Sequence, residues 1–167
     1  MESQKVIDIL KQSILAEKRG CAFYASVAEQ AKDPEIRNIF TIMAEEETMH
    51  VKFLCEQFVS FSNNRQFLKM TLPHRTKDNI ANLVLSAEVT KKISAAGIEA
   101  AAISAAIDME KNAIGVYSSQ AETSTDPEEQ KLFSWLADWE RTHLKLLTSL
   151  DDELKERIWF DNQFWPF

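Results

Sequence analysis

Hydrophobic side chains recur along this chain at intervals of three, four or seven residues, the spacing that puts them on one face of an α-helix. Four such stripes can be followed, in residues 4–31, 34–64, 93–123 and 128–158. Their members are Leu10, Ile14, Cys21, Tyr24 and Ala28; Ile36, Phe40, Met43, Leu54 and Phe61; Ile103, Ile107, Ile114, Tyr117 and Ala121; and Phe133, Leu136, Leu147, Leu150 and Leu154. The pattern predicts four long helices.

Two copies of the tripeptide Asp-Pro-Glu separate the stripes within each half of the chain, at residues 33–35 and 126–128. Aspartate suits the N-cap of a helix, and proline suits the first helical position, where its missing N–H costs nothing. Residues 65–92 form the one long connection, with Pro73 in an aperiodic part and a short helix expected around Lys77 to Lys91.

The two halves are copies of each other at a shift of 93 residues. Matched pairs include Glu17/Glu110, Lys18/Lys111, Tyr24/Tyr117, Phe40/Phe133, Ala44/Ala137, Glu47/Glu140 and His50/His143. Short loops force antiparallel neighbours, whereas a long connection can cross a bundle. We therefore expect an all-α fold, a single four-helix bundle domain over residues 1–167. It would comprise hairpin one (about 4–64), a crossover with a short helix (about 65–92), hairpin two (about 93–158) and an aromatic tail (159–167).

Composition agrees with this fold and excludes several functions. Three Gly and four Pro in 167 residues are too few for an all-β chain with frequent turns. A formal charge of −7 argues against a protein that tracks nucleic-acid phosphates. No secretory signal or membrane-length apolar segment is recognisable, so we expect a cytoplasmic protein with no membrane partner. The two cysteines, 34 residues apart, form no CxxC motif and are expected to be core residues.

Six ionisable residues interrupt the apolar stripes. They are Glu17, Glu47, His50, Glu110, Glu140 and His143. Four carboxylates in an apolar core repel one another and are costly to desolvate, and the nearby basic residues fall off the stripes. Bound metal cations are the simplest way to balance the negative charge of the four carboxylates.

Glu and His three residues apart project from the same helix face, so each Glu-x-x-His motif offers one oxygen and one nitrogen ligand. With 17 Glu and 3 His, chance predicts roughly 0.3 such motifs, yet two occur at equivalent repeat positions. Two Glu-x-x-His helices and two single-Glu helices form the known ligand pattern of dimetal carboxylate bundles. The alternative is that Glu and His only pair with each other as core hydrogen bonds.

The motifs Glu17-Lys18 to Phe23-Tyr24, Ala44 to His50, and their copies up to His143 resemble the rubrerythrin branch of the ferritin-like superfamily. The resemblance implies a ferritin-like bundle holding two irons, with Glu47 and Glu140 bridging, Glu17 and Glu110 terminal, and His50 and His143 each capping one iron. It also implies reduction of hydrogen peroxide or dioxygen. Because four carboxylates and two imidazoles suit iron or manganese, zinc would be expected only as a substitute in purified material.

The chain departs from typical rubrerythrins in two respects. It has no rubredoxin-type CxxC pairs, so we expect a separate electron-donor protein. Ile107 occupies a position where the family has a further Glu, which makes the ligand set symmetrical, as in bacterioferritin. A ferroxidase or iron-handling role, oxidation of an organic substrate, and a non-enzymatic metal-stabilised interaction module therefore stay open.

Several residues outside the six have weaker assignments. Tyr24 and Tyr117 lie two turns after Glu17 and Glu110, within reach of the carboxylates as hydrogen-bond donors, or else simply at the core edge. Glu45, Glu46 and Glu99 lie off the stripes and are expected to be solvated, and His74 is expected to be a surface residue. The tail, with five aromatics in residues 159–167, must dock on its own bundle or on a second subunit, and family habit favours a homodimer.

Overall fold

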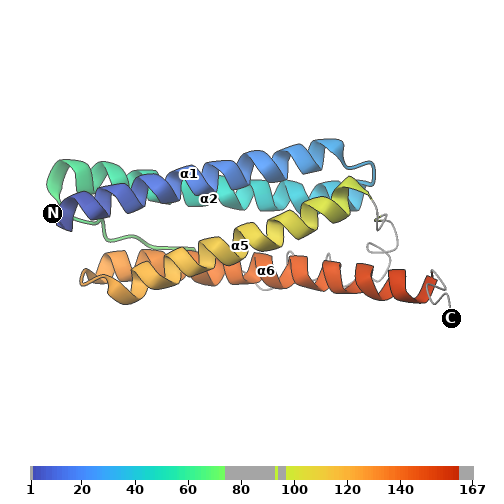
Figure 1. Cartoon of the computed structure of the whole chain (residues 1–167). Coiled ribbons are helices and arrows are strands. Elements are labelled where there is room, and N and C mark those ends of the chain that lie inside the picture. Colours follow the sequence, from blue (N-terminus) through green and yellow to red (C-terminus); the bar gives the residue numbers. More distant parts are fainter. Residues whose placement is uncertain (1, 74–92, 94–96, 162–167) are drawn as a thin grey trace.

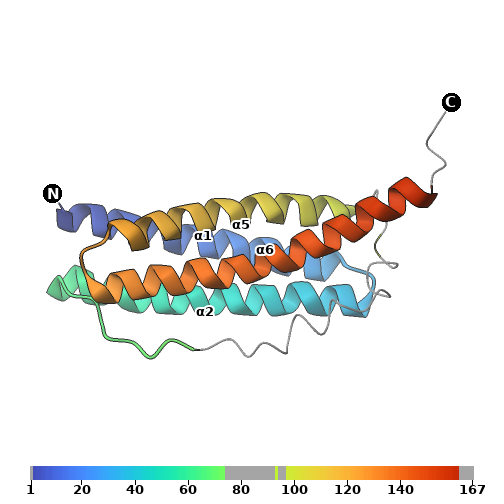
Figure 2. The same ribbon diagram turned by 90° about the horizontal axis from the view of Figure 1, so that it is seen from below.

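The computed structural model describes residues 2–73, 93 and 97–161, and the side chains of residues 3–73, 93 and 97–156. The described part contains four helices and no strands: α1 (Glu2–Gln30), α2 (Pro34–Asn64), α5 (Ile98–Thr123) and α6 (Pro127–Asp161). Helices α1 and α2 pack along their length as one hairpin and α5 and α6 as another, and the two hairpins lie side by side as a four-helix bundle (Figures 1 and 2). The predicted all-α, ferritin-like fold class is confirmed. None of the described helices combines the length and apolar character needed to cross a membrane.

The repeated Asp-Pro-Glu motif starts a helix in both hairpins. Asp33 Oδ1 accepts hydrogen bonds from the backbone N–H groups of Glu35 (2.9 Å) and Ile36 (3.3 Å). Asp126 Oδ1 does the same for Glu128 (2.8 Å) and Glu129 (3.2 Å). Each aspartate satisfies N–H groups that have no partner within the helix, so the same three residues set both hairpin turns.

Two helix boundaries differ from the sequence prediction. The third helix was expected from Ile93, but α5 begins at Ile98, after Gly97 in an extended conformation (φ −84°, ψ 170°). Ile93 still belongs to the core, with 1% of its surface exposed. At the other end, α6 continues to Asp161 and so includes the first three residues of the predicted tail, because no Gly or Pro interrupts the chain between Pro127 and Pro166. The expected short helix at 77–91, His74 and residues 162–167 lie outside the described residues.

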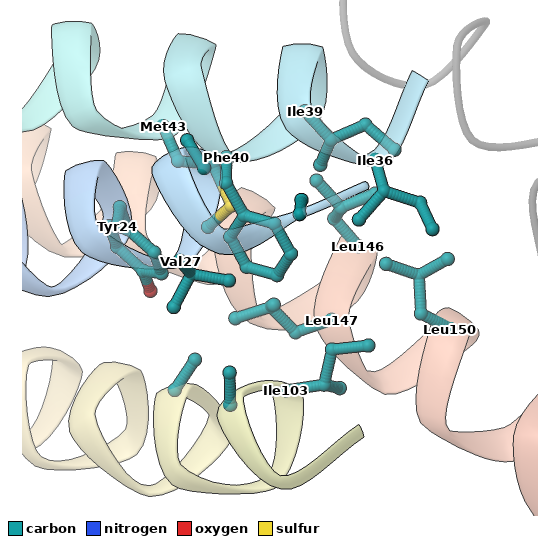
Figure 3. Close-up of a cluster of buried hydrophobic side chains, with 14 of the residues drawn as sticks. Tyr24, Val27, Ile36, Ile39, Phe40, Met43, Ile103, Leu146, Leu147 and Leu150 are labelled. Atoms are coloured by element: carbon teal, nitrogen blue, oxygen red, sulfur yellow. The ribbon is translucent and has the colours of Figure 1, made fainter. Parts of the chain in front are cut away.

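The core is two hydrophobic clusters separated by a polar layer. One cluster, shown in part in Figure 3, comprises the end of α1, the start of α2, the start of α5 and the end of α6. The other comprises the opposite ends of the same helices. The six ionisable residues of the stripes lie between them along every helix. Packing on both sides fixes the helix positions, and hence the geometry of this layer.

The crossover leaves α2 at Arg65, whose left-handed conformation (φ 57°) ends the helix. The Gln57 side-chain oxygen accepts from the backbone N–H of Leu68 at 2.8 Å, and its amide donates to the Leu68 carbonyl at 2.9 Å. The Trp135 indole donates to the Pro73 carbonyl at 2.9 Å, which ties the start of the crossover to α6.

Candidate metal centre

Each of the four helices contributes to one buried polar cluster. Glu17 comes from α1, Glu47 and His50 from α2, Glu110 from α5, and Glu140 and His143 from α6. All six residues are at most 4% exposed, and the two histidines are fully buried. The structure thus brings together every residue that the sequence predicted as a metal ligand, although their role as ligands stays a prediction.

The six side chains form two overlapping donor sets. One contains Glu17, Glu47, His50 and Glu140, and the other contains Glu47, Glu110, Glu140 and His143; in each set the ligand atoms lie within 4.8 Å of one another. Glu47 and Glu140 belong to both sets. This sharing is the geometry expected if the two carboxylates bridge a pair of metal ions.

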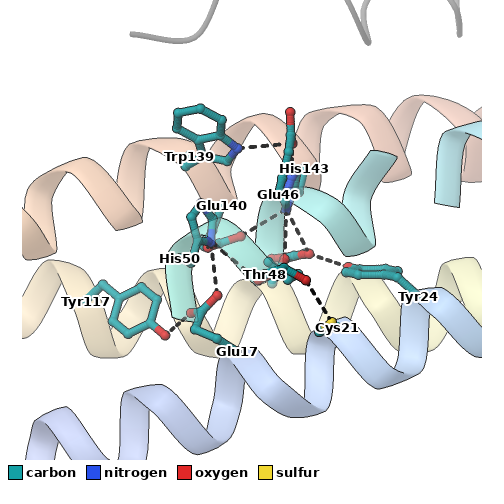
Figure 4. Close-up of polar contacts among 12 residues, drawn as sticks. Glu17, Cys21, Tyr24, Glu46, Thr48, His50, Tyr117, Trp139, Glu140 and His143 are labelled. Carbon is teal, nitrogen blue, oxygen red and sulfur yellow. Dashed lines mark hydrogen bonds and ion pairs between the residues drawn. The ribbon is translucent and has the colours of Figure 1, made fainter. Parts of the chain in front are cut away.

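Both histidines direct the same nitrogen toward the carboxylates (Figure 4). His50 Nδ1 lies 3.0 Å from Glu17 Oε2 and 3.0 Å from Glu140 Oε1. His143 Nδ1 lies 3.0 Å from Glu140 Oε2 and 3.3 Å from Glu47 Oε1. The two imidazoles therefore offer equivalent ligand atoms from opposite sides of the cluster.

The fit of the cluster to metal ions is supported by buried atoms without hydrogen bonds. Within the described part of the chain these include both carboxylate oxygens of Glu140 and Nδ1 of His143. Buried polar groups normally have partners, and a carboxylate between two imidazoles with no such partner is a donor group suited to a cation. Lys18, Arg19, Lys52 and Arg141, the nearby basic residues, are all exposed, so they do not supply the compensating charge.

In the metal-free cluster, burial makes the carboxylates at the edge hard to ionise. Desolvation, with the neighbouring Glu47 carboxylate, raises the pKa of Glu17 to about 7. Desolvation likewise raises the pKa of Glu110 to about 8, with the charges of Glu140 and Glu47 adding to it. Protons therefore take the place of metal charge at these two residues near neutral pH.

The centre of the cluster behaves in the opposite way. Burial opposes ionisation of Glu140, but the facing His50 charge and the close approach of both imidazoles, each 3.0 Å from a Glu140 oxygen, hold its pKa at about 2. Burial also opposes charge on His50, yet the Glu140 carboxylate and its neighbours raise the His50 pKa well above its ordinary value. The cluster thus keeps the Glu140 carboxylate ionised and favours the protonated, positively charged form of the neighbouring His50.

Two tyrosines join the hairpins through this cluster. The Tyr24 hydroxyl donates to Glu110 Oε1, and the Tyr117 hydroxyl donates to Glu17 Oε1. Both tyrosines are at most 1% exposed. The prediction that they reach the carboxylates is confirmed, and each one contacts the glutamate of the other hairpin.

Glu46 was wrongly expected to be solvated. Its side chain is 17% exposed, and Oε2 lies 2.7 Å from His143 Nε2 and 3.1 Å from the indole nitrogen of Trp139. Helical periodicity does not identify Glu46 as a buried residue, because Glu46 lies one position before the stripe residue Glu47. One signal was available in the sequence: the 93-residue shift pairs Glu46 with Trp139, a break in the repeat beside two matched ligands.

A cavity of about 330 Å³ reaches the cluster between α1 and α5. Its lining includes Glu17, Glu47, Glu110 and Glu140, both tyrosines, and small or apolar residues such as Ala16, Gly20, Ala113 and Val116. Contacts between α1 and α5 are sparse compared with those inside each hairpin. The cavity therefore offers a route between these two helices to the carboxylates.

The family model for rubrerythrin matches residues 8–151. The chain belongs to the rubrerythrin family. A solved structure described as a hypothetical protein from Pyrococcus furiosus is similar over 90% of each chain, with 21% sequence identity and a TM-score of 0.65. That likeness supports the fold alone. In this rubrerythrin-family chain, Ile107 is buried and apolar, so among the described residues α5 contributes a single glutamate, Glu110, to the two donor sets.

Proposed function

We propose that the protein is a non-haem di-iron oxidoreductase that reduces hydrogen peroxide or dioxygen with electrons from a separate donor protein. The observation that carries the proposal is the sharing of Glu47 and Glu140 by two four-residue donor sets. A single-metal site would not need the second set, and neither buried Glu140 oxygen has a hydrogen bond within the described part of the chain that a metal ion would have to displace.

The donor chemistry favours iron. Carboxylate oxygens and imidazole nitrogens in high coordination suit iron or manganese, whereas structural zinc prefers tetrahedral sites that are often rich in thiolate. Both cysteines, Cys21 and Cys55, lie outside the two donor sets. Two divalent ions would also offset the four buried carboxylates.

When bound, two ferrous ions would supply the two electrons that, with two protons, convert hydrogen peroxide into two molecules of water. The chain's own residues would admit and orient the oxidant. The cavity beside Gly20 and Ala113 gives a small molecule access to the carboxylates, while Tyr24 and Tyr117 hold Glu110 and Glu17 in place. The hydrophobic clusters on either side keep bulk water away from the rest of the layer.

The electron donor, the homodimer and a cytoplasmic location remain parts of this proposal. The 167-residue sequence contains no CxxC pair that would carry a rubredoxin-type iron, and we therefore propose a separate protein as the source of electrons. Docking of the aromatic tail on a second subunit is the arrangement we propose for the dimer.

A ferroxidase role is the second candidate, in which ferrous iron is itself the substrate. It is favoured by Ile107, which leaves each half of the site with one terminal glutamate and one histidine around the two shared carboxylates. In that case oxidised iron would leave the site and be replaced.

Anaerobic loading with Fe²⁺, followed by stopped-flow mixing with hydrogen peroxide or with dioxygen, separates these roles. We expect about two irons per chain and faster oxidation by peroxide, with the iron retained. Faster reaction with dioxygen and turnover of added Fe²⁺ beyond two per chain would replace the peroxidase proposal by the ferroxidase. Reaction no faster than that of free Fe²⁺, together with metal-dependent melting, would overturn both and indicate a structural metal site.

A further inference from the structure

The two histidines of the cluster are equivalent on their inner side but not on their outer side. His143 Nε2 lies 2.7 Å from Glu46 Oε2, so this imidazole is held by a carboxylate on the side away from the cluster. Figure 4 shows Glu46 between Trp139 and His143. The histidine therefore has a carboxylate on both of its ring nitrogens.

His50 has a different outer environment. It is fully buried, and its Nε2 has no hydrogen-bond partner among the residues that the structure describes. The rings of Trp135 and Trp139 lie against it edge to face, with centroids 5.3 and 5.5 Å away and interplanar angles of 79° and 86°. Two indole rings therefore pack against His50, and no carboxylate of the described residues binds the nitrogen that corresponds to the one bound by Glu46.

The difference in carboxylate contact comes from a break in the internal repeat at position 46. Position 46 in hairpin one corresponds to position 139 in hairpin two, where tryptophan replaces glutamate. These two residues also meet in space, because the Trp139 indole donates to Glu46 Oε2 at 3.1 Å. One carboxylate therefore serves His143, and its tryptophan counterpart packs against His50.

This difference changes how well each imidazole can bind a metal. An imidazole that binds through Nδ1 carries its proton on Nε2. A carboxylate that accepts this proton fixes the ring orientation and makes the ligand nitrogen more basic, and loss of such a partner typically costs 10- to 100-fold in metal affinity. His50 in the same state would direct a buried N–H at indole rings, which are much weaker acceptors.

We propose that the two metal positions are unequal, and that Glu46 is the positioning residue that makes them so. The position capped by His143 binds its metal more tightly and fills first. The position capped by His50 fills second and exchanges its metal more readily. The inference rests on dimetal binding in the proposed function, but it does not depend on peroxide or dioxygen as the oxidant.

Anaerobic titration with Co²⁺ against a competing chelator, followed by the visible absorption of the bound ion, tests this inequality without any turnover. The wild-type protein should bind two Co²⁺ in two steps whose affinities differ by roughly 10- to 100-fold. His143→Ala should remove the tight step, and His50→Ala the weak one. Circular dichroism and melting of each variant without metal verify that the bundle is folded.

Glu46→Ala should weaken the tight step by roughly 10- to 100-fold and leave the weak step almost unchanged. Glu46→Gln keeps an oxygen acceptor without the charge and should fall between the alanine variant and the wild type. Glu45→Ala, a change at the adjacent exposed glutamate, is the matched control and should bind both ions as the wild type does.

Two equal steps in the wild type would overturn the inequality while leaving the dimetal site intact. So would a Glu46→Ala variant that weakens both steps equally or neither. A wild-type protein that binds no Co²⁺ would overturn the proposed function as well, so the two failures are distinguishable.

Discussion

The Tyr24 hydroxyl of the first hairpin hydrogen-bonds to Glu110 of the second, 86 residues away in the sequence. The reciprocal bond runs from Tyr117 to Glu17, across 100 residues. Helices α1 and α5 pack less closely against each other than the two helices within either hairpin, so these two bonds are direct links between the hairpins. The tyrosines therefore stabilise the bundle as well as orient two proposed ligands.

Removing either hydroxyl should destabilise the metal-free protein. Tyr24→Phe or Tyr117→Phe leaves a buried carboxylate oxygen without its donor, which we expect to lower the free energy of unfolding by about 1–3 kcal/mol. Urea denaturation of each variant in the presence of a chelator measures this. The near symmetry of the two contacts predicts similar losses, and variants as stable as the wild type would show that the bonds do not join the hairpins.

The stability of the metal-free protein should fall as pH rises from about 5 to about 8. The raised pKa values of Glu17, about 7, and Glu110, about 8, mean that the folded protein holds protons which the unfolded chain releases near its ordinary value of 4.5. The raised pKa values of His50 and His143 act in the same direction, because their contribution is complete below pH 6.5 and is lost above it. Glu140 titrates near 2 and does not contribute in this window.

Metal should reverse this dependence, because cations and protons compete for the same carboxylates and imidazoles. The difference in melting temperature between metal-loaded and chelator-treated protein should therefore grow from pH 5 to pH 8. Thermal unfolding at each pH, with and without Fe²⁺ under anaerobic conditions, measures it. A metal-induced stabilisation that is constant across this range would contradict the assignment of these titrating groups as ligands.

Gly20 leaves space for one of the two shared carboxylates. A Cβ at this position would lie 3.4 Å from Glu47 Cδ and 3.5 Å from Cγ, whereas a Cβ at Gly115 would meet nothing within 4 Å. Gly20→Ala would therefore place a methyl group in van der Waals contact with the Glu47 side chain, which should limit movement of this carboxylate and slow oxidation of the loaded site a few-fold. Both alanine variants should keep or increase helix stability, by up to about 1 kcal/mol.

Comparison with Gly115→Ala separates crowding from helix propensity. Gly115→Ala should react at the wild-type rate, and stopped-flow oxidation of the two iron-loaded variants makes the comparison. Equal rates for both variants would mean that Glu47 needs no room beyond what it already has.

The sequence predicts most of the fold because apolar residues recur at helical spacing and a recognisable capping motif starts a helix in each hairpin. The repeated Asp-Pro-Glu caps start α2 and α6 at Pro34 and Pro127, as expected. The start of α5 is less predictable, because its N-cap is Gly97, which has no side chain to form a capping hydrogen bond. Helix boundaries that a capping side chain marks are thus predicted better than boundaries that depend on tertiary packing.

The residues of the candidate metal centre likewise differ in how well the sequence predicts them. The six residues of the cluster were identifiable because charged groups interrupt apolar stripes and recur 93 residues apart. Glu46 was not, because its burial depends on how α6 lies against α2, where His143 and Trp139 reach it. Contacts between hairpins follow from the packing of whole helices, which periodicity within one helix does not report.

The central claim is that Glu47 and Glu140 are shared by two metal ions in one buried site. Mössbauer spectroscopy of protein loaded with ⁵⁷Fe²⁺ and then oxidised, with iron counted per chain, tests it most directly. We predict about two irons per chain with a magnetically coupled spectrum in the wild type, and loss of coupling and of bound iron in Glu47→Ala and Glu140→Ala. Iron at one per chain or less, or uncoupled iron that both variants retain, would contradict the claim.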